Sequence, residues 1–366
     1  MSETQSFELG EFVPKTQNLN PAHFPDETFE LLSIPAFDAG SAEHVLGSEF
    51  GSSKQVVFPG DVMISKIIPH IRRVWVVPEP NGDYRQIASG EWIVFRTDKV
   101  LASWLRHYLL SDRFHAQFLN TVAGVGGSLV RARPQFVKKI RVDVPSKEVQ
   151  ESEALAKDLQ ELIEQKRERQ RELLNELEYA VFQELFERET SDYLPLGKII
   201  DSLEGGKNLV SNNSEEDTSY RVLKISAVTK ENFSFTETKP LPADYTPPAS
   251  HIVKKGDLLI SRANTSEMVG AAALVGDVTD NFALPDKIWK FVWNEDSRVT
   301  PEYIYCLLRS PKMRREIQKI ATGTSGSMKN ISKKNLLRLN ISIPKQEQLD
   351  LFNKFFQHSR KFKENY

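Results

Sequence analysis

The sequence predicts an α+β fold in which two similar globular domains are separated by long antiparallel coiled-coil helices, a pseudo-two-fold internal repeat. Three observations predict it: a segment-by-segment repeat, a helical run without glycine or proline between the copies, and mixed strand and helix patterns inside each copy. The chain has 366 residues, 40% hydrophobic and 27% charged, which suits a globular protein of two or three domains and excludes a disordered or collagen-like chain.

The repeat keeps its order along the chain while its offset grows slowly. Three matched pairs at offsets of 187, 196 and 199 mark it: Leu9-Gly10 with Leu196-Gly197, Pro59–Lys66 (PGDVMISK) with Lys255–Arg262 (KGDLLISR), and Lys138–Pro145 with Leu337–Pro344. Because the offset between matched motifs changes only by loop-sized insertions, we interpret the chain as a duplicated domain.

Within each copy, β-branched and aromatic runs predict strands, and amphipathic runs predict helices. We expect strands at Val74–Val77, Trp92–Arg96 and Ala271–Val275. We expect one continuous helix at each of Ala102–Asn120 and Pro301–Ala321, each followed by a glycine-rich loop. Trp92 and Trp289 are expected in the core rather than stacked on bases.

The run from Lys147 to Tyr193 is rich in strong helix formers and predicts one long helix of about 40 residues, or roughly 60 Å. Its apolar stripe needs a partner helix and comprises Leu155, Leu159, Leu162, Leu173 and Leu177. The run after Pro344 offers one, with Leu349, Phe352 and Phe356 at helical spacing. Two packed helices of an ordinary core are the alternative interpretation.

These patterns divide the chain into four parts. Residues 1–145 form the first globular domain, and residues 194–344 form the second. Residues 146–193 form the central spacer helix, and residues 345–366 form a C-terminal helix that pairs with it.

The formal net charge of −2 conceals an uneven distribution. Residues 147–190 carry 13 acidic and 7 basic side chains, whereas residues 60–141 carry 13 basic and 6 acidic ones, and residues 256–340 carry 13 basic and 9 acidic ones. Two separated basic blocks favour a nucleic-acid partner, which the net charge alone does not suggest.

The sequence has no motif that indicates catalysis. It lacks a GxxxxGK[ST] phosphate loop, a GxSxG elbow and any His–His or His–Cys pair at metal-ligand spacing. Cys306 is the only cysteine, and no apolar run is long enough to cross a membrane. We therefore expect a cytoplasmic, non-catalytic protein without a membrane partner, a cofactor or a metal.

Basic and amide side chains recur after the glycine-rich loop and after the GD-x-x-[IL]-S-[KR] strand of both copies. Lys and Arg neutralise phosphates, and Arg, Gln and Asn can read base edges. A solvated basic face is the alternative for one copy, but recurrence in both copies favours DNA. The candidate DNA-binding residues are Lys66, Arg72, Arg73, Arg131, Arg133, Gln135, Lys138, Lys139, Arg262, Asn264, Ser325, Ser327, Lys329, Asn330, Lys333 and Lys334.

Each copy carries a GD strand, a helix with a Leu-x-Ser end, a glycine-rich loop and a closing strand that ends in proline, at Val142–Pro145 and Ile341–Pro344. This arrangement resembles the specificity (S) subunit of type I restriction–modification systems over essentially the whole chain. The resemblance implies that each globular domain is a target recognition domain that reads one half of a bipartite double-stranded DNA site through the major groove.

The resemblance also implies partners. The long helices would set the distance between the half-sites and dock two methyltransferase (M) subunits, which bind S-adenosylmethionine, and restriction (R) subunits can join the complex. The leucines of the central helix, with Leu349, Phe352 and Phe356, are therefore the candidate partner-binding residues. The C-terminal helix is about half as long as the central one, so a partner or a second copy of the chain would complete the pair.

One alternative function belongs to another class: a helical protein-interaction scaffold whose two domains bind partners and have no DNA role. A nuclease has little support in the sequence. Salt separates the first two, because phosphate-dominated binding weakens steeply with ionic strength and apolar docking does not.

Overall fold

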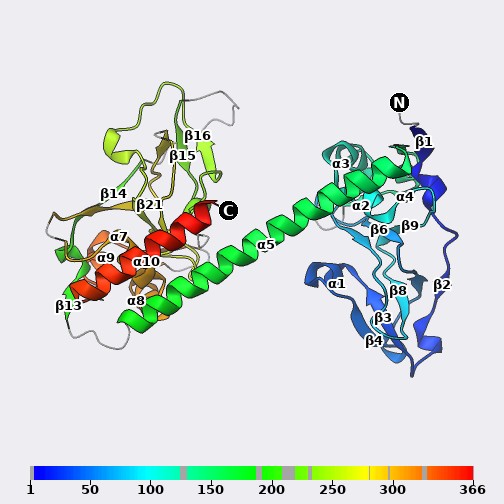
Figure 1. Ribbon diagram of the computed structural model, residues 1–366, viewed down its shortest axis with the longest axis horizontal. Coiled ribbons are helices and arrows are strands. Elements are labelled where there is room, and N and C mark those ends of the chain that lie inside the picture. The colour runs from blue at the N-terminus through cyan, green and yellow to red at the C-terminus, as the bar shows by residue number, and fades with distance from the viewer. Residues whose placement is uncertain are drawn as a thin grey trace. The chain divides into compact units, whose positions relative to one another are not determined.

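The protein is described by a computed structural model that covers residues 4–123, 130–186, 192–207, 219–229, 233–279, 281–295, 297–323 and 328–365. The chain divides into two compact units, unit 1 (residues 1–166) and unit 2 (residues 167–366). Helix α5 (Lys147–Phe186) begins in unit 1 and ends in unit 2 (Figure 1). The predicted α+β fold with a long helix between two sheet-containing units is confirmed.

Unit 1 contains two main sheets. Strands β7-β6-β9 form an antiparallel sheet, and β2-β5-β8-β3-β4 form a second sheet in which β3 and β8 are parallel. The strands are β2 (Asn18–Leu19), β3 (Thr28–Leu32), β4 (Glu43–Leu46), β5 (Lys54–Val56), β6 (Val62–Ser65), β7 (Val74–Val76), β8 (Arg85–Ala88) and β9 (Trp92–Phe95). Strand β6 is buried on both faces, because Val62 and Ile64 join one apolar cluster and Met63 joins another.

Unit 2 repeats this plan. Its main sheet has the order β14-β21-β17-β19, and its second sheet, β16-β15-β20, again contains one parallel pair, β15 and β20. The strands are β14 (Ile200–Gly205), β15 (Arg221–Leu223), β16 (Thr238–Pro240), β17 (Leu258–Ser261), β19 (Ala272–Leu274), β20 (Phe282–Ala283) and β21 (Ile288–Trp293). Trp92 and Trp289 are buried, as predicted.

The two continuous helices expected in the copies are each broken in two, which corrects the prediction. The pieces are α2 (Ala102–Leu110) and α3 (Asp112–Leu119) in unit 1, and α7 (Pro301–Arg309) and α8 (Pro311–Ile320) in unit 2. Ser111 and Ser310 lie at the breaks with extended backbone, and each hydroxyl accepts a hydrogen bond from a backbone N–H of the following helix at 3.3 Å. The serine of the Leu-x-Ser motif is thus an N-cap.

Shorter elements complete the units. The helices are α1 (Ile34–Ala39), α4 (Pro134–Val137), α6 (Ser226–Thr229) and α9 (Lys333–Leu337), and the 3-10 helices are η1 (Leu9–Phe12), η2 (Pro21–His23), η3 (Gly47–Glu49), η4 (Leu196–Lys198) and η5 (Ala249–His251). The two-stranded ribbons are β1 (Gln5–Glu8) with β12 (Arg141–Val144), β10 (Val122–Ala123) with β11 (Arg131–Ala132), β13 (Tyr193–Pro195) with β23 (Asn340–Ser342), and β18 (Ala263–Asn264) with β22 (Lys329–Asn330).

The duplication extends to strand register. Ser6 pairs with Asp143 in the ribbon β1·β12, and Tyr193 pairs with Ser342 in β13·β23. The second pair is the first one shifted by the sequence offsets of 187 and 199. Each copy therefore brings its beginning and its end together in the same register.

The GD motif forms the same turn in both copies. Gly60 and Gly256 have φ angles of +85° and +86°, a conformation that favours glycine. The carboxylate of Asp61 accepts a hydrogen bond from the backbone N–H three residues earlier at 2.9 Å, and Asp257 does the same at 2.8 Å. The motif is therefore structural and sets the start of strands β6 and β17.

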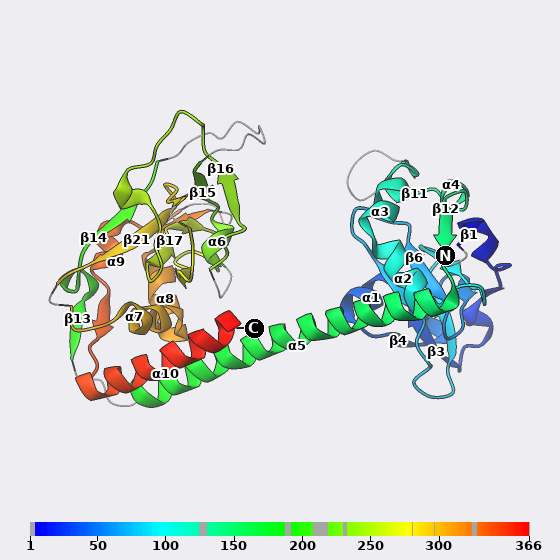
Figure 2. The same cartoon turned by 45° about the horizontal axis from the view of Figure 1, so that its top comes forward.

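Helix α10 (Gln346–Asn365) runs antiparallel to the end of α5 inside unit 2 (Figures 1 and 2). Gln348 donates a hydrogen bond to the carbonyl oxygen of Leu185 at 2.9 Å, whereas Lys363, far along α10, donates to Asn175 at 2.7 Å. The aromatic ring of Phe352 packs against Phe182, with 5.8 Å between centroids.

Candidate nucleic-acid interface

The two basic segments predicted separately in copy one lie side by side. The backbone N–H of Ala132 donates to the carbonyl oxygen of Lys66 at 2.8 Å, and that of Ile68 donates to Val130 at 3.1 Å. The end of the GD strand therefore pairs with the segment that follows the glycine-rich loop, which carries Arg131 and Arg133.

Copy two repeats this junction. The backbone N–H of Ile331 donates to the carbonyl oxygen of Arg262 at 2.8 Å, and Asn264 pairs with Lys329 in the ribbon β18·β22. The basic residues that recur at matching positions of the two copies thus lie at the same place in each unit.

In unit 1, the predicted cations differ in how accessible they are. Arg73 is buried and forms a bidentate ion pair with Asp38 at 2.7 and 2.8 Å, which removes it from the candidate surface and corrects the prediction. Arg72 donates to Asp112 at 2.6 Å, and Arg131 lies 3.3 Å from Glu91. These two remain exposed but are already paired with carboxylates.

Helix α4 and its C-terminal end form the most open part of the predicted surface. Arg133, Gln135, Lys138 and Lys139 are all exposed there. The guanidinium carbon of Arg133 lies 4.1 Å from the ring centroid of Phe136, which the sequence reasoning missed because an aromatic in an apolar register suggests core. Phe136 is 37% exposed, so an aromatic face lies among exposed cations, of which Arg133 also donates to the carbonyl oxygen of Thr121 at 3.1 Å.

In unit 2, several predicted cations are already hydrogen-bonded to carbonyl oxygens of their own unit. Arg262 donates to Asp286 at 2.7 Å, Lys329 to Gly323 at 2.6 Å and Lys333 to Leu203 at 2.5 Å. The side-chain oxygen of Asn264 accepts from the N–H of Thr265 at 2.8 Å. Asn330 is half-buried in β22, and Lys334 is exposed. Ser325 and Ser327 lie outside the described residues.

The carboxylate of the GD turn is paired with a cation in both copies. In unit 1, Asp61 is 2% exposed and accepts two hydrogen bonds from Arg96 at 2.6 Å, which raise the pKa of that guanidinium. In unit 2, burial raises the pKa of Asp257, and the ammonium of Lys290 lies 3.7 Å away. Asp61 and Asp257 lie at the start of strands β6 and β17, and Lys66 and Arg262 follow the other ends of these strands.

The leucine stripe of α5 is open to solvent. The exposed fractions of Leu155, Leu159, Leu162, Leu173 and Leu177 lie between 47% and 60%. Leu349, Phe352 and Phe356, predicted as partner-binding, are instead at most 2% exposed. Phe352 packs on Phe182 and Phe186, which lie on a different face of α5 from the leucines. All three predicted residues belong to the buried core of unit 2, which corrects the prediction.

The start of α5 is fixed to unit 1 by polar contacts that the sequence did not reveal. His107 is 6% exposed; its Nε2 lies 2.6 Å from Asp158 and its Nδ1 lies 3.6 Å from Glu161. These three form the one group with metal-ligand spacing found among the described residues. Because the two ring nitrogens face different carboxylates, we interpret the group as a tie between α2 and α5 rather than as a metal site.

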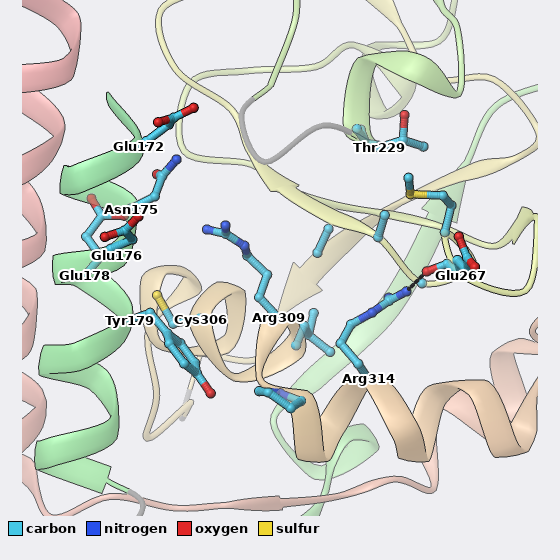
Figure 3. Close-up of a pocket in the computed structure, with 17 residues that line it drawn as sticks. Glu172, Asn175, Glu176, Glu178, Tyr179, Thr229, Glu267, Cys306, Arg309 and Arg314 are labelled. Carbon is cyan, nitrogen blue, oxygen red and sulfur yellow. Dashed lines mark hydrogen bonds between the residues drawn. The ribbon is translucent and has the colours of Figure 1, made fainter. Parts of the chain in front are cut away.

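A cavity of about 510 Å³ opens in unit 2 between α5, α7 and α8 (Figure 3). Arg309 projects towards the α5 wall, which carries Glu172 and Glu176, and Arg314 donates to the carbonyl oxygen of Glu267 at 2.6 Å. Burial raises the pKa of the Cys306 thiol, which also lines the cavity, so that thiol is a poor nucleophile.

Comparison with known proteins finds a related domain in unit 2. The model described as type I restriction modification DNA specificity domain matches residues 189–364. Residues 189–364 thus match the DNA specificity domain of type I restriction–modification systems. The chain is 27% identical over 155 residues to the type I restriction enzyme EcoEI specificity subunit of Escherichia coli. That match covers 42% of the chain and 26% of the relative, so it spans about a quarter of the relative's length.

Solved structures from type I restriction–modification systems share the fold. The type I restriction–modification system S subunit from M. genitalium is similar with a TM-score of 0.55 at 10% identity, over 100% of this chain and 93% of that one. A chain from a type I restriction–modification system studied for complex assembly and conformational transition has a TM-score of 0.52 at 18% identity. The match covers 99% of this chain and 92% of that one. Among the residues that the structure describes, no helix is both long and apolar enough to cross a bilayer.

Proposed function

We propose that this chain is the non-catalytic DNA sequence-recognition subunit of a type I restriction–modification complex. The observation that carries the proposal is the repeated junction, in which Lys66 and Ala132 in unit 1 and Arg262 and Ile331 in unit 2 make the same backbone hydrogen bond. Each unit thereby presents basic and amide side chains from two distant segments on one surface. Such a surface suits phosphate contacts and base-edge contacts.

Two such units in one chain match a bipartite DNA site. We propose that residues 1–145 and 194–344 are target recognition domains and that each reads one half-site of double-stranded DNA. Residues 146–193 would act as the spacer that sets the distance between half-sites, since α5 is continuous over 40 residues. The helix 345–366 would stabilise one end of that spacer.

The exposed leucine stripe of α5 is the proposed docking surface for two M subunits. Five leucines that are about half exposed on one helix face are costly to leave in water and are typical of a protein interface. The methyltransferase and endonuclease activities would then reside in the M and R subunits. A protein of this function works in the cytoplasm, where its DNA lies.

The test is a pull-down with co-expressed M subunits, followed by DNA binding over a salt series. A complex with two M subunits per chain whose affinity for DNA falls steeply with salt supports the proposal. A chain that recruits M subunits but shows no salt-dependent DNA binding favours the interaction-scaffold alternative.

A further inference from the structure

Unit 1 contains a basic hollow of about 190 Å³, where the segment after η1 passes strand β9 and helix α4. The polar side chains that line it come from distant positions: Lys15, Thr16, Gln17, Gln55, Lys66, Arg96 and Lys138. None of the described residues that line it is an aspartate or a glutamate. At ~30 Å³ per water, the hollow holds about six waters, or one phosphate group with part of its hydration shell.

Three of the four cations in this hollow are uncompensated. Arg96 is neutralised by the buried Asp61, but the ammonium groups of Lys15, Lys66 and Lys138 have no hydrogen-bond or ion-pair partner within the described ranges. Three like charges around one small space repel one another, and a bound anion relieves that repulsion.

Five other cations of unit 1 form ion pairs with carboxylates, in contrast to the three lysines of the hollow. The ion pairs are Arg72 with Asp112, Arg73 with Asp38, Arg85 with Glu27, Arg113 with Asp143 and Arg131 with Glu91. The lysines of the hollow thus form a cluster whose positive charge no carboxylate neutralises among the described residues.

The second copy has lost this site. At the offset of 199, Pro134 of the hollow corresponds to Lys333, and Lys138 corresponds to Leu337. The ammonium of Lys333 donates to the carbonyl oxygen of Leu203 at 2.5 Å and lies 5.7 Å from the ring centroid of Trp289. Leu203 corresponds to Thr16, which lines the hollow in unit 1. In unit 2, the ammonium of Lys333 therefore occupies the position that corresponds to the hollow of unit 1.

We propose that the hollow of unit 1 binds a phosphate group through Lys15, Lys66 and Lys138, and that this phosphate is a backbone phosphate of the bound DNA. The chemistry of the site follows from the hollow alone, whereas the DNA as its source rests on the proposed function. The unpaired lysines and the absence of carboxylates favour a phosphate over a neutral or cationic ligand. Unit 1 then holds a phosphate anchor that unit 2 lacks.

The test uses the full chain with two substitutions, Lys66→Gln and Lys138→Gln. The matched control removes two exposed lysines that lie outside the hollow, Lys157→Gln and Lys361→Gln. The first readout is the rise in unfolding temperature caused by inorganic phosphate at constant ionic strength. The second is the slope of log Kd for DNA against log salt concentration.

We expect the double variant to lose the phosphate-induced stabilisation and to reduce the salt slope by about one phosphate contact, that is by about 0.9. The control should keep both properties. An unchanged phosphate response in the double variant overturns the site. If the phosphate response is lost but the salt dependence of DNA binding is unchanged, the bound phosphate is not a backbone phosphate of DNA. A wild-type chain that binds phosphate but not DNA contradicts the proposed function and leaves the phosphate site supported.

Discussion

The hydroxyl of Ser359 on α10 donates a 2.7 Å hydrogen bond to the carboxylate of Glu178 on α5, and both residues are buried. The ammonium of Lys363 lies 2.7 Å from the second oxygen of the same carboxylate. A polar cluster thus fixes the register of the helix pair in a region that is otherwise packed by phenylalanine rings. It also explains why α10 lies beside the end of α5 and not on its leucine stripe.

Replacing Lys363 by Met should destabilise unit 2 by about 3 kcal/mol, because the charge of Glu178 would remain buried without its counter-ion. Urea unfolding of the full chain measures the loss. The double substitution Glu178→Met with Lys363→Met should recover most of it, and Lys361→Met, at an exposed position of the same helix, should cost little. A single variant as stable as the control would show that the ion pair contributes nothing.

Replacing Leu159 and Leu173 by Asp should abolish binding of M subunits while the chain stays folded. Both side chains are about half exposed, so each substitution should cost no more than about 1 kcal/mol of unfolding free energy. Co-purification with tagged M subunits measures binding, and circular dichroism checks folding. Unchanged co-purification would remove the leucine stripe as the docking surface. By contrast, Phe352→Asp should unfold unit 2, because Phe352 is 0% exposed.

Replacing Lys139 and Arg141 by Gln should weaken binding to all DNA sequences by a similar factor. Both side chains are exposed beside α4 and carry charge rather than a fixed base-reading geometry. Each lost phosphate contact should lower the salt slope by about one. Binding to a panel of duplexes measures the effect. An altered preferred sequence with intact affinity would mean that these residues read bases.

Glu27 gives unit 1 a defined dependence on pH. Its bidentate hydrogen bonds to Arg85 lower the pKa of the Glu27 carboxyl below 4.5. Since the folded state binds this proton less tightly than the unfolded state, the pair stabilises the fold above about pH 4.5, and that contribution disappears as pH falls through the lowered pKa. The unfolding midpoint of Glu27→Gln should therefore lie below that of wild type at pH 7 and approach it at pH 3. A constant difference at both pH values would contradict this assignment.

The fold could be predicted from the sequence to the level of the repeat. Matched motifs at offsets of 187 to 199 predict two copies of one domain, and the register of Ser6 with Asp143 and of Tyr193 with Ser342 follows the same offsets. The helix α5 was predictable because composition alone favours it over 40 residues. The breaks at Ser111 and Ser310 were missed, since amphipathic spacing continues across a cap.

The candidate site was predictable in location but not in the state of each side chain. Recurrence places basic residues at the two junctions, but it cannot show that Arg73 is buried against Asp38 or that Lys333 is bound to the carbonyl of Leu203. Such pairings depend on segments 35 and 130 residues away, which a local pattern does not report. For the same reason Lys15, outside every motif, was overlooked, and Phe352 was assigned to a partner surface.

The central claim, that two units of one chain read two half-sites, is tested most directly by selecting DNA from a random duplex library. The bait is the complex of this chain with M subunits, and the bound fraction is sequenced. The account predicts enrichment of two short specific sequences separated by a fixed number of unspecified base pairs, with Gln135→Ala affecting one half at most. Enrichment of a single continuous sequence, or of none, would contradict it.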